Sequence, residues 1–405
     1  MKQNPFIIAA MLLALMAGCK EQTTGPEEIL DETDGRITIT NDETVLNDRV
    51  TITDEDIAVE EAGLGKGTRT MAFSLKLIAE IKSPRVSGQT LQATSIALVD
   101  GYAYVSFMMI GVTAIGGVDA VELKKGSNPK LKSQATFADT DVISVSYHND
   151  NVYLSGATGN PAFDVPAVVE VIDAPGGKFK LKNSFRRQLK SYAATSIAAG
   201  SSGIYTTTGN TGGLFVLVGD TLTIQSEAPL DDARWVGYDD TYLVVVQGTP
   251  GRITVYNKAS LAHLSTYNFD GASIAESKST VQIIGGKALI AAGDGGVVLM
   301  NLLTGAVVGS IPRTIVAGLD PSVTVTNAVA ASGKYVFISN GEAGVYVAES
   351  SHDLGQNTGG IPITLKVLGK LKFKNLQSVN HVAFDGSDLV IASGLGGVKI
   401  VRMTL

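Results

Sequence analysis

Residues 295–300 read GGVVLM, a glycine pair followed directly by an apolar run. Tight turns between β-strands need positive φ angles, which glycine adopts without a steric clash of a Cβ atom. Seven segments share this arrangement of a small or glycine-rich turn leading into an apolar run: residues 115–123, 166–173, 212–218, 251–256, 295–300, 343–349 and 396–401. The chain therefore contains seven copies of one strand-forming unit.

Each copy contains signals for further short strands. Residues 93–97 and 194–198 both read ATSIA, and apolar strands such as residues 335–339 precede the glycine turns. A weaker strand follows each turn segment, as at residues 130–137. Residues 69–405 divide into seven units of about 48 residues, with four short strands and no helical period in each. We therefore predict an all-β chain, a seven-bladed β-propeller of residues 69–405 with four antiparallel strands per blade.

The two ends of the repeat region complement each other. The last unit supplies only three strands before Leu405, whereas residues 71–82 form a lone strand before the first complete unit. Residues 75–81 (LKLIAEI) are similar to residues 365–371 (LKVLGKL), the fourth strand of the sixth unit. We therefore predict that the N-terminal strand completes the seventh blade and closes the ring.

The first 18 residues are typical of a targeting sequence. Lys2 is followed by an apolar run over residues 6–18, which is too short to cross a bilayer core of about 30 Å but has the length of a signal-peptide core. The run ends in LMAGC, which resembles a bacterial lipobox and predicts lipidation of Cys19, the only cysteine. An ordinary secretory signal with an incidental cysteine is the alternative. Residues 1–18 are thus expected to be a lipoprotein signal peptide.

The next segment differs in composition from the rest of the chain. Residues 20–68 contain 14 acidic and 4 basic residues and no aromatic residue. Such a segment buries too little apolar surface to offset its chain entropy, so we expect residues 19–68 to form an acidic flexible tether that starts at Cys19. Residues 36–40 (RITIT) and 49–53 (RVTIT) alternate like strands, and a small hairpin between them is the alternative.

Part of the repeat resembles a known family. Residues 117–137 contain an apolar strand, a polar turn with Asn128-Pro129, and a second strand that ends in Phe137, and residues 167–173 are similar to the first half of that pattern. This resembles the LVIVD-type repeat of bacterial and archaeal surface proteins. The resemblance implies a propeller outside the cytoplasm, and it implies no reaction. Residues 20–22 (KEQ) loosely resemble the signal that sends Bacteroidota lipoproteins to the cell surface.

The composition limits the chemistry of the chain. A single cysteine excludes a disulfide framework and a multi-cysteine zinc site. The net charge of −7 argues against a nucleic-acid partner, although the acidic segment carries that charge and residues 69–405 carry +2. The four histidines do not have metal-ligand spacing, and no nucleophile elbow occurs. We therefore expect no catalytic residues, no metal and no cofactor.

Propellers bind ligands where the loops enter the innermost strands, at the mouth of the axial channel. Aligning the repeats places Thr94, Thr195, Ser279, Asn327 and Asn380 at one equivalent position. The predicted channel-mouth set is a mixed polar ring, which either binds a small polar ligand or lines a water-filled channel: Thr94, Asp141, Thr195, Arg234, Lys278, Asn327, Asn380 and His381.

Two functions are compatible with these features. The first is a non-enzymatic binding scaffold of the cell envelope, attached to the outer membrane through Cys19, with an envelope protein or a glycan as its partner and no nucleic-acid partner. It would face the cell exterior or the periplasm. The alternative is a polysaccharide lyase or hydrolase with its site at the channel mouth. The small number of histidines and aromatic residues argues against this alternative.

Overall fold

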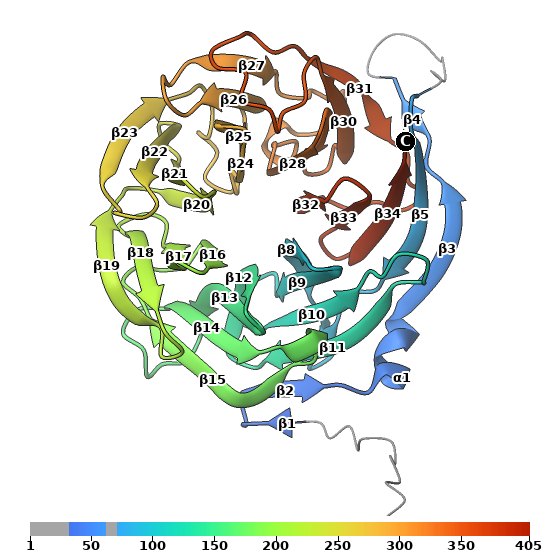
Figure 1. Ribbon diagram of the computed structural model, residues 1–405. Helices are drawn as coiled ribbons and strands as arrows, with labels where there is room; N and C mark the ends of the chain where they lie inside the picture. The colour runs from blue at the N-terminus through green and yellow to red at the C-terminus, as the bar shows by residue number, and fades with distance from the viewer. Residues whose placement is uncertain (1–31, 62–70) are drawn as a thin grey trace, which may run out of the picture.

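The computed structural model describes residues 32–61 and 71–405. It is a ring of seven β-sheet blades around a common axis, as predicted (Figure 1). Each blade has four antiparallel strands that lie side by side in order from the axis to the rim, so its first strand is innermost. Apolar residues on both faces of each sheet pack between neighbouring blades, as Val105 and Phe107 of one blade do with Val390 of the adjacent one.

The strands of the blades follow the chain order. Blades 1 to 3 consist of β8 (Gln92–Val99), β9 (Tyr102–Met108), β10 (Gly116–Glu122) and β11 (Lys130–Phe137); β12 (Thr140–His148), β13 (Asn151–Thr158), β14 (Ala167–Asp173) and β15 (Lys180–Gln188); and β16 (Ser196–Gly200), β17 (Gly203–Thr207), β18 (Gly213–Val218) and β19 (Thr223–Pro229). Blades 4 and 5 consist of β20 (Ala233–Tyr238), β21 (Tyr242–Gln247), β22 (Arg252–Asn257) and β23 (His263–Asn268); and β24 (Val281–Ile284), β25 (Lys287–Ala291), β26 (Val297–Asn301) and β27 (Val307–Ile311).

The last two blades surround the point where the ring closes. Blade 6 consists of β28 (Ala328–Ser332), β29 (Tyr335–Ser339), β30 (Val345–Ser350) and β31 (Leu365–Leu371), and blade 7 of β32 (His381–Phe384), β33 (Asp388–Ala392), β34 (Val398–Thr404) and β5 (Ser74–Ile81). The predicted closure is confirmed, because β5 pairs antiparallel with β34. Leu75, Leu77, Ala79 and Ile81 of β5 are all buried. A two-stranded ribbon of β6 (Arg85–Val86) and β7 (Gln89–Thr90) precedes blade 1.

The acidic segment is not a tether over residues 32–61, and this correction concerns most of its length. These residues form β1 (Glu32–Thr33), β2 (Ile37–Thr40), α1 (Glu43–Leu46), a 3-10 turn η1 (Asn47–Arg49), β3 (Val50–Asp56) and β4 (Val59–Glu60). They run along the rim of the disc, and we refer to residues 32–61 as the belt (Figure 1). Cys19, the signal peptide and the rest of the expected tether lie outside the described residues.

The belt adds fifth strands to three consecutive blades. β2 pairs with β11 of blade 1, β3 with β5 of blade 7 and β4 with β31 of blade 6, so the hairpin considered for β2 and β3 does not form. Strand addition to an existing edge requires few apolar side chains of the added chain, because the edge already supplies backbone partners. Ile37 and Ile39 are fully buried, which is enough to fix the register.

The repeated Arg-x-Thr-Ile-Thr segments of the belt have equivalent roles. Arg36, before β2 on blade 1, donates to both carboxylate oxygens of Glu170 in blade 2 at 2.8 and 3.0 Å. Arg49, before β3 on blade 7, donates to both oxygens of Asp119 in blade 1 at 3.1 and 2.6 Å. Asp119 and Glu170 occupy equivalent positions in the third strands β10 and β14, and both are buried. Each arginine therefore ties one blade to the next.

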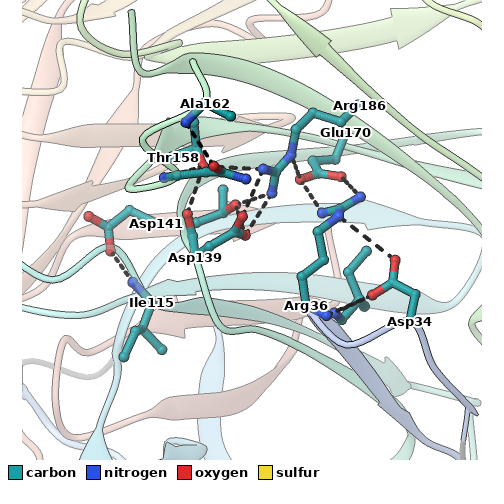
Figure 2. Close-up of polar contacts among 12 residues, drawn as sticks. Asp34, Arg36, Ile115, Asp139, Asp141, Thr158, Ala162, Glu170 and Arg186 are labelled. Atoms are coloured by element: carbon teal, nitrogen blue, oxygen red, sulfur yellow. Dashed lines mark hydrogen bonds and ion pairs between the residues drawn. The ribbon is translucent and has the colours of Figure 1, made fainter. Parts of the chain in front are cut away.

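Blade 2 contains a larger ionic network around Glu170 (Figure 2). Arg186 on β15 donates from Nε to Glu170 at 2.6 Å and from its terminal nitrogens to both oxygens of Asp139 at 2.9 and 2.8 Å. Burial raises the pKa of Asp139, but the bonds and charge of Arg186 outweigh it and hold that pKa below its usual value. The carboxylates are thus neutralised by arginines from the belt and from the blade itself.

Candidate functional site

One face of the disc carries the loops that lead toward the axis. In each blade, the loop between the second and third strands and the connection into the first strand of the next blade lie at the same end of the sheet, because successive strands are antiparallel. We refer to this side as the top face and to the opposite side as the bottom face. The predicted channel-mouth residues belong to the top face.

Four of the aligned polar residues join neighbouring blades. The Thr94 hydroxyl donates to the Val142 carbonyl oxygen in blade 2 at 2.9 Å, and the Thr195 hydroxyl donates to the Ala233 carbonyl oxygen in blade 4 at 2.8 Å. The other two are amides: Asn327 donates to the Val379 carbonyl oxygen at 3.5 Å, and Asn380 donates to the Ala93 carbonyl oxygen at 2.8 Å. We refer to these four residues as the latches, because each donates a hydrogen bond to the next blade. Their donor groups, which we expected to face a ligand, are therefore used within the ring.

A cavity of about 630 Å³ opens on the top face at the axis. Five of the eight predicted residues line it: Thr94, Thr195, Arg234, Lys278 and Asn380. Asp141, Asn327 and His381 do not. The other lining residues come from blades 1 to 4 and from the loops that lead into blades 3 and 5, and they are Gln92, Met108, Ile143, Ser191, Tyr192, Ala193, Thr208, Gly209, Asn210, Asp232, Trp235, Ala275, Glu276 and Ser277. A cavity of this size accommodates a small ligand.

Lys278 crosses the axis. It lies in the loop before β24 of blade 5, and its Nζ donates to the Thr94 carbonyl oxygen of blade 1 at 2.7 Å. These two blades lie on opposite sides of the ring (Figure 1). Among the described residues, no carboxylate forms an ion pair with Lys278. Burial lowers the pKa of Lys278 to about 7, because the charged ammonium loses water without gaining an anion.

An aromatic pair also crosses the axis. Trp235 of blade 4 stacks on His381 of blade 7, with ring centroids 5.4 Å apart. His381 is buried, and its Nδ1 has no hydrogen-bond partner among the described residues. Burial, with the charge of Lys278 adding to it, lowers the pKa of His381 to about 3, so its imidazole is neutral. His381 therefore supports the cavity wall from behind Trp235.

The remaining charged groups of the cavity are one arginine–aspartate ion pair and one exposed glutamate. Arg234 is buried and donates to both oxygens of Asp232 at 3.0 and 2.6 Å, and it also donates to the carbonyl oxygen of Ile274 at 2.8 Å. Glu276 is exposed at the cavity mouth. Glycoside hydrolysis commonly uses two carboxyl groups that are both available for catalysis. With Asp232 engaged by Arg234, the cavity wall provides one.

Asp141 has a structural role outside the cavity wall. Its Oδ1 accepts bonds from the backbone N–H groups of Met109 and Ile115 at 3.3 and 3.2 Å, which holds together the two ends of the loop between β9 and β10. Figure 2 shows its carboxylate directed at Ile115. Burial raises the pKa of Asp141 to about 6, more than these bonds lower it.

Sequence reasoning missed the aromatic part of the site. Trp235 is the only tryptophan in the chain, and Tyr192 is 74% exposed at the cavity edge. Tyr192 lies three residues before Thr195 and Trp235 directly follows Arg234, so both stand beside residues that the sequence analysis selected. In residues 32–61 and 71–405, no group of three or more histidine, cysteine, aspartate or glutamate side chains could hold a metal ion, and no helix has the length and apolarity to cross a membrane.

The fold is shared with solved propellers. The structure of U3-55K aligns with a TM-score of 0.58 and 14% identity over 78% of this chain and 96% of that one. The WD40 β-propeller domain of Doa1 aligns with a TM-score of 0.53 and 10% identity over 82% of this chain and 98% of that one. BamB from Moraxella catarrhalis reaches a TM-score of 0.48, at 13% identity over 80% and 99%. No family model and no curated protein sequence matches the chain. At these identities the similarity establishes the β-propeller fold alone.

Proposed function

We propose that this chain is a lipid-anchored β-propeller of the bacterial cell envelope, of the LVIVD-repeat type, that binds an envelope protein or glycan through its top face. The observation that carries the binding role is the position of exposed apolar side chains. Five lie in top-face loops, namely Ile110, Val112, Tyr192, Ile315 and Leu395, all at least 42% exposed. Isolated exposed apolar residues are common, but a set on one face, around a cavity, is typical of a binding surface.

The loops of the bottom face contain two exposed large hydrophobic side chains among the described residues, Leu303 and Ile361, and Leu405 follows the bottom end of β34. Val307 and Leu264 are exposed near the bottom ends of outer strands, at the rim and away from any axial cavity. A binding role is favoured over a polysaccharide lyase or hydrolase because Asp232 is engaged by Arg234 and the axial latches use their donors within the ring. The anchor rests on the lipobox-like sequence before Cys19.

A photocrosslinking experiment in intact cells tests the binding face. A benzophenone amino acid replaces Tyr192 on the top face, and in a matched control it replaces Ile361, which is 55% exposed on the bottom face. We expect a discrete adduct with one envelope component from position 192 and none from position 361. Equal adducts from both positions, or an adduct from position 361 alone, would contradict the proposed binding face.

Acyl labelling tests the anchor. The full chain should incorporate a clickable fatty acid and sediment with membranes, and the variant Cys19→Ala should lose the label and move to the soluble fraction. Cys19 is the only cysteine, so the label has a single candidate thiol. Sedimentation of the Cys19→Ala variant with membranes in high salt would contradict a lipid anchor.

A further inference from the structure

The Lys278 side chain is half-buried, and its ammonium differs from the buried cations of the disc. Arg186 and Lys399 each form ion pairs with carboxylates, and Lys287 donates to two carbonyl oxygens, both at 2.8 Å. Lys278 has one carbonyl oxygen, that of Thr94, and its ammonium group has three hydrogens to donate. The cavity therefore contains a cation whose hydrogen-bonding capacity and charge are both incompletely used.

The other cation of the cavity is not available in the same way. The Arg234 guanidinium is bonded to both oxygens of Asp232 and to backbone carbonyl oxygens, so the pair is neutral and its donors are occupied. Glu276 is exposed, where solvent and salt screen its charge. The centre of the cavity thus carries one positive charge when Lys278 is protonated, below about pH 7.

Apolar side chains form much of the surrounding wall. Trp235 lines the cavity and is held in place by its stack on His381. The other apolar residues of the cavity wall are Met108, Ile143, Ala193 and Ala275. An ammonium in such surroundings attracts an anion more strongly than one in water does, because the local dielectric constant is lower. A ligand that matches this wall has an apolar body and a single negative charge.

We propose that the axial cavity binds a small organic monocarboxylate, with its carboxylate on the Lys278 ammonium and its apolar body against Trp235. The class is a monoanion, because phosphates and dicarboxylates favour clusters of cationic donors and only one is available here. The cavity of about 630 Å³ accommodates a body of several carbon atoms. This inference concerns a small-molecule site and requires neither the lipid anchor nor the macromolecular partner proposed above.

The protonation of Lys278 predicts how the affinity for a carboxylate depends on pH. Its pKa of about 7 in the free protein must rise when a carboxylate lies beside it, because an opposite charge favours the charged form. Binding therefore takes up a proton above pH 7, and affinity is full below that pH and falls as the pH rises above it. The neighbouring charged or titratable groups are Arg234, Asp232, Glu276 and His381. His381 stays neutral over this range, since its pKa is about 3.

Intrinsic fluorescence gives a direct measurement, because Trp235 is the only tryptophan. The probes are hexanoate and its uncharged counterpart hexanamide, titrated into the full chain at pH 6 and pH 8. We expect hexanoate to bind at least tenfold more tightly than hexanamide at pH 6, and to bind about tenfold more weakly at pH 8 than at pH 6. Hexanamide affinity should not change with pH. Equal affinity for the two probes, or no binding of either, would overturn the proposal.

A matched pair of variants assigns the effect to Lys278. Lys278→Gln keeps a donor for the Thr94 carbonyl oxygen and removes the charge, so the preference for hexanoate should fall to within twofold. Lys190→Gln removes an exposed lysine that pairs with Glu227, and the preference should remain. A preference that persists in Lys278→Gln would overturn the assignment. If that variant does not fold, the pH dependence of the unmodified chain still decides, and neither result affects the crosslinking test at Tyr192.

Discussion

The rim and the axis of this disc differ in how completely their charged groups are compensated. At the rim, the buried carboxylates Asp119 and Glu170 are each bound by arginines, and added strands of the belt cover the outer edges of three blades. At the axis, neutral side chains such as Thr195 and Asn380 each donate one hydrogen bond to the next blade. Arg234 is paired with Asp232 there, but Lys278 has no carboxylate partner among the described residues.

This difference separates stability from binding. A buried ion pair is costly to break from one side, because the remaining charge has no compensation. The half-buried Lys278 ammonium, which has no carboxylate partner among the described residues, already bears part of that cost, and a ligand of opposite charge relieves it. We therefore expect substitutions at the rim to change mainly the free energy of unfolding, and substitutions at the axis to change mainly ligand selectivity.

The largest effect should come from removing the closing strand. Deletion of residues 71–82 removes β5, which pairs with β34 on one side and β3 on the other. The loss of four buried apolar side chains alone is about 6 to 8 kcal/mol, close to the whole stability of a typical domain. We expect aggregation or a large loss of melting temperature, measured by circular dichroism and size-exclusion chromatography. An unchanged melting curve would show that the pairing of β5 with β34 does not hold the ring closed.

The two belt arginines should differ from each other. Arg49→Met leaves the fully buried Asp119 with Gln134 as its remaining side-chain donor and should cost about 3 to 5 kcal/mol. Arg36→Met leaves Glu170 bound to Arg186 and should cost about 1 to 2 kcal/mol. Chemical denaturation measures both. Equal costs would mean that the remaining partners of the buried carboxylate do not determine how much each belt arginine contributes to the free energy of unfolding.

The sequence predicted the blades well because their periodicity is encoded locally. Glycine turns and alternating apolar residues mark each strand, and residues 365–371 identified the closing strand through their similarity to residues 75–81. The belt was missed because the composition of a segment indicates only whether that segment can form a hydrophobic core of its own. Ile37 and Ile39 instead use the existing edge of blade 1, a partner 90 residues or more away in the sequence.

The axial site was predicted in part for a similar reason. Aligning the repeats located the entry positions of the inner strands, so Thr94, Thr195 and Asn380 were placed in the cavity wall. Their hydrogen bonds to the next blade depend on contacts between neighbouring repeats, which no single repeat contains. The stack of Trp235 on His381 joins blades that are three apart, and the alignment holds no information on such pairs.

Removing one latch hydrogen bond should lower the free energy of unfolding by a moderate amount. Thr195→Val removes the hydroxyl that donates to the Ala233 carbonyl oxygen, but that oxygen also accepts a bond from the Gly209 N–H at 2.9 Å. The cost should be about 1 kcal/mol, the usual contribution of one neutral hydrogen bond. Denaturation with urea measures it, and Thr195→Ser, which keeps the hydroxyl, is the control. A cost as large as that of Arg49→Met would remove the distinction between rim and axis.

The smallest and most specific test uses two aspartates that are two positions apart. Asp139 belongs to the paired network of Arg186, and Asp141 accepts bonds from backbone N–H groups (Figure 2). In the part of the chain that the structure describes, no cation forms an ion pair with Asp141. The pKa of Asp141 is raised to about 6, so the folded state binds more protons than the unfolded state between about pH 4 and pH 6. This stability is present at low pH and lost as the pH rises through 6.

Asp141→Asn keeps the Oδ1 acceptor and removes the charge, so it should stabilise the protein at pH 8 and have little effect at pH 3.5, below the pKa of an unfolded aspartate. The pKa shift alone corresponds to roughly 3 kcal/mol, and solvent screening of this partly exposed carboxylate reduces the expected gain to about 1 kcal/mol. Asp139→Asn should do the reverse at pH 8, because its lowered pKa reflects a charge that Arg186 stabilises. Urea denaturation at the two pH values measures both differences. Destabilisation by Asp141→Asn at pH 8 would mean that its charge, like that of Asp139, is compensated in the folded state, and the division between a paired rim and an unpaired axis would then not extend to blade 2.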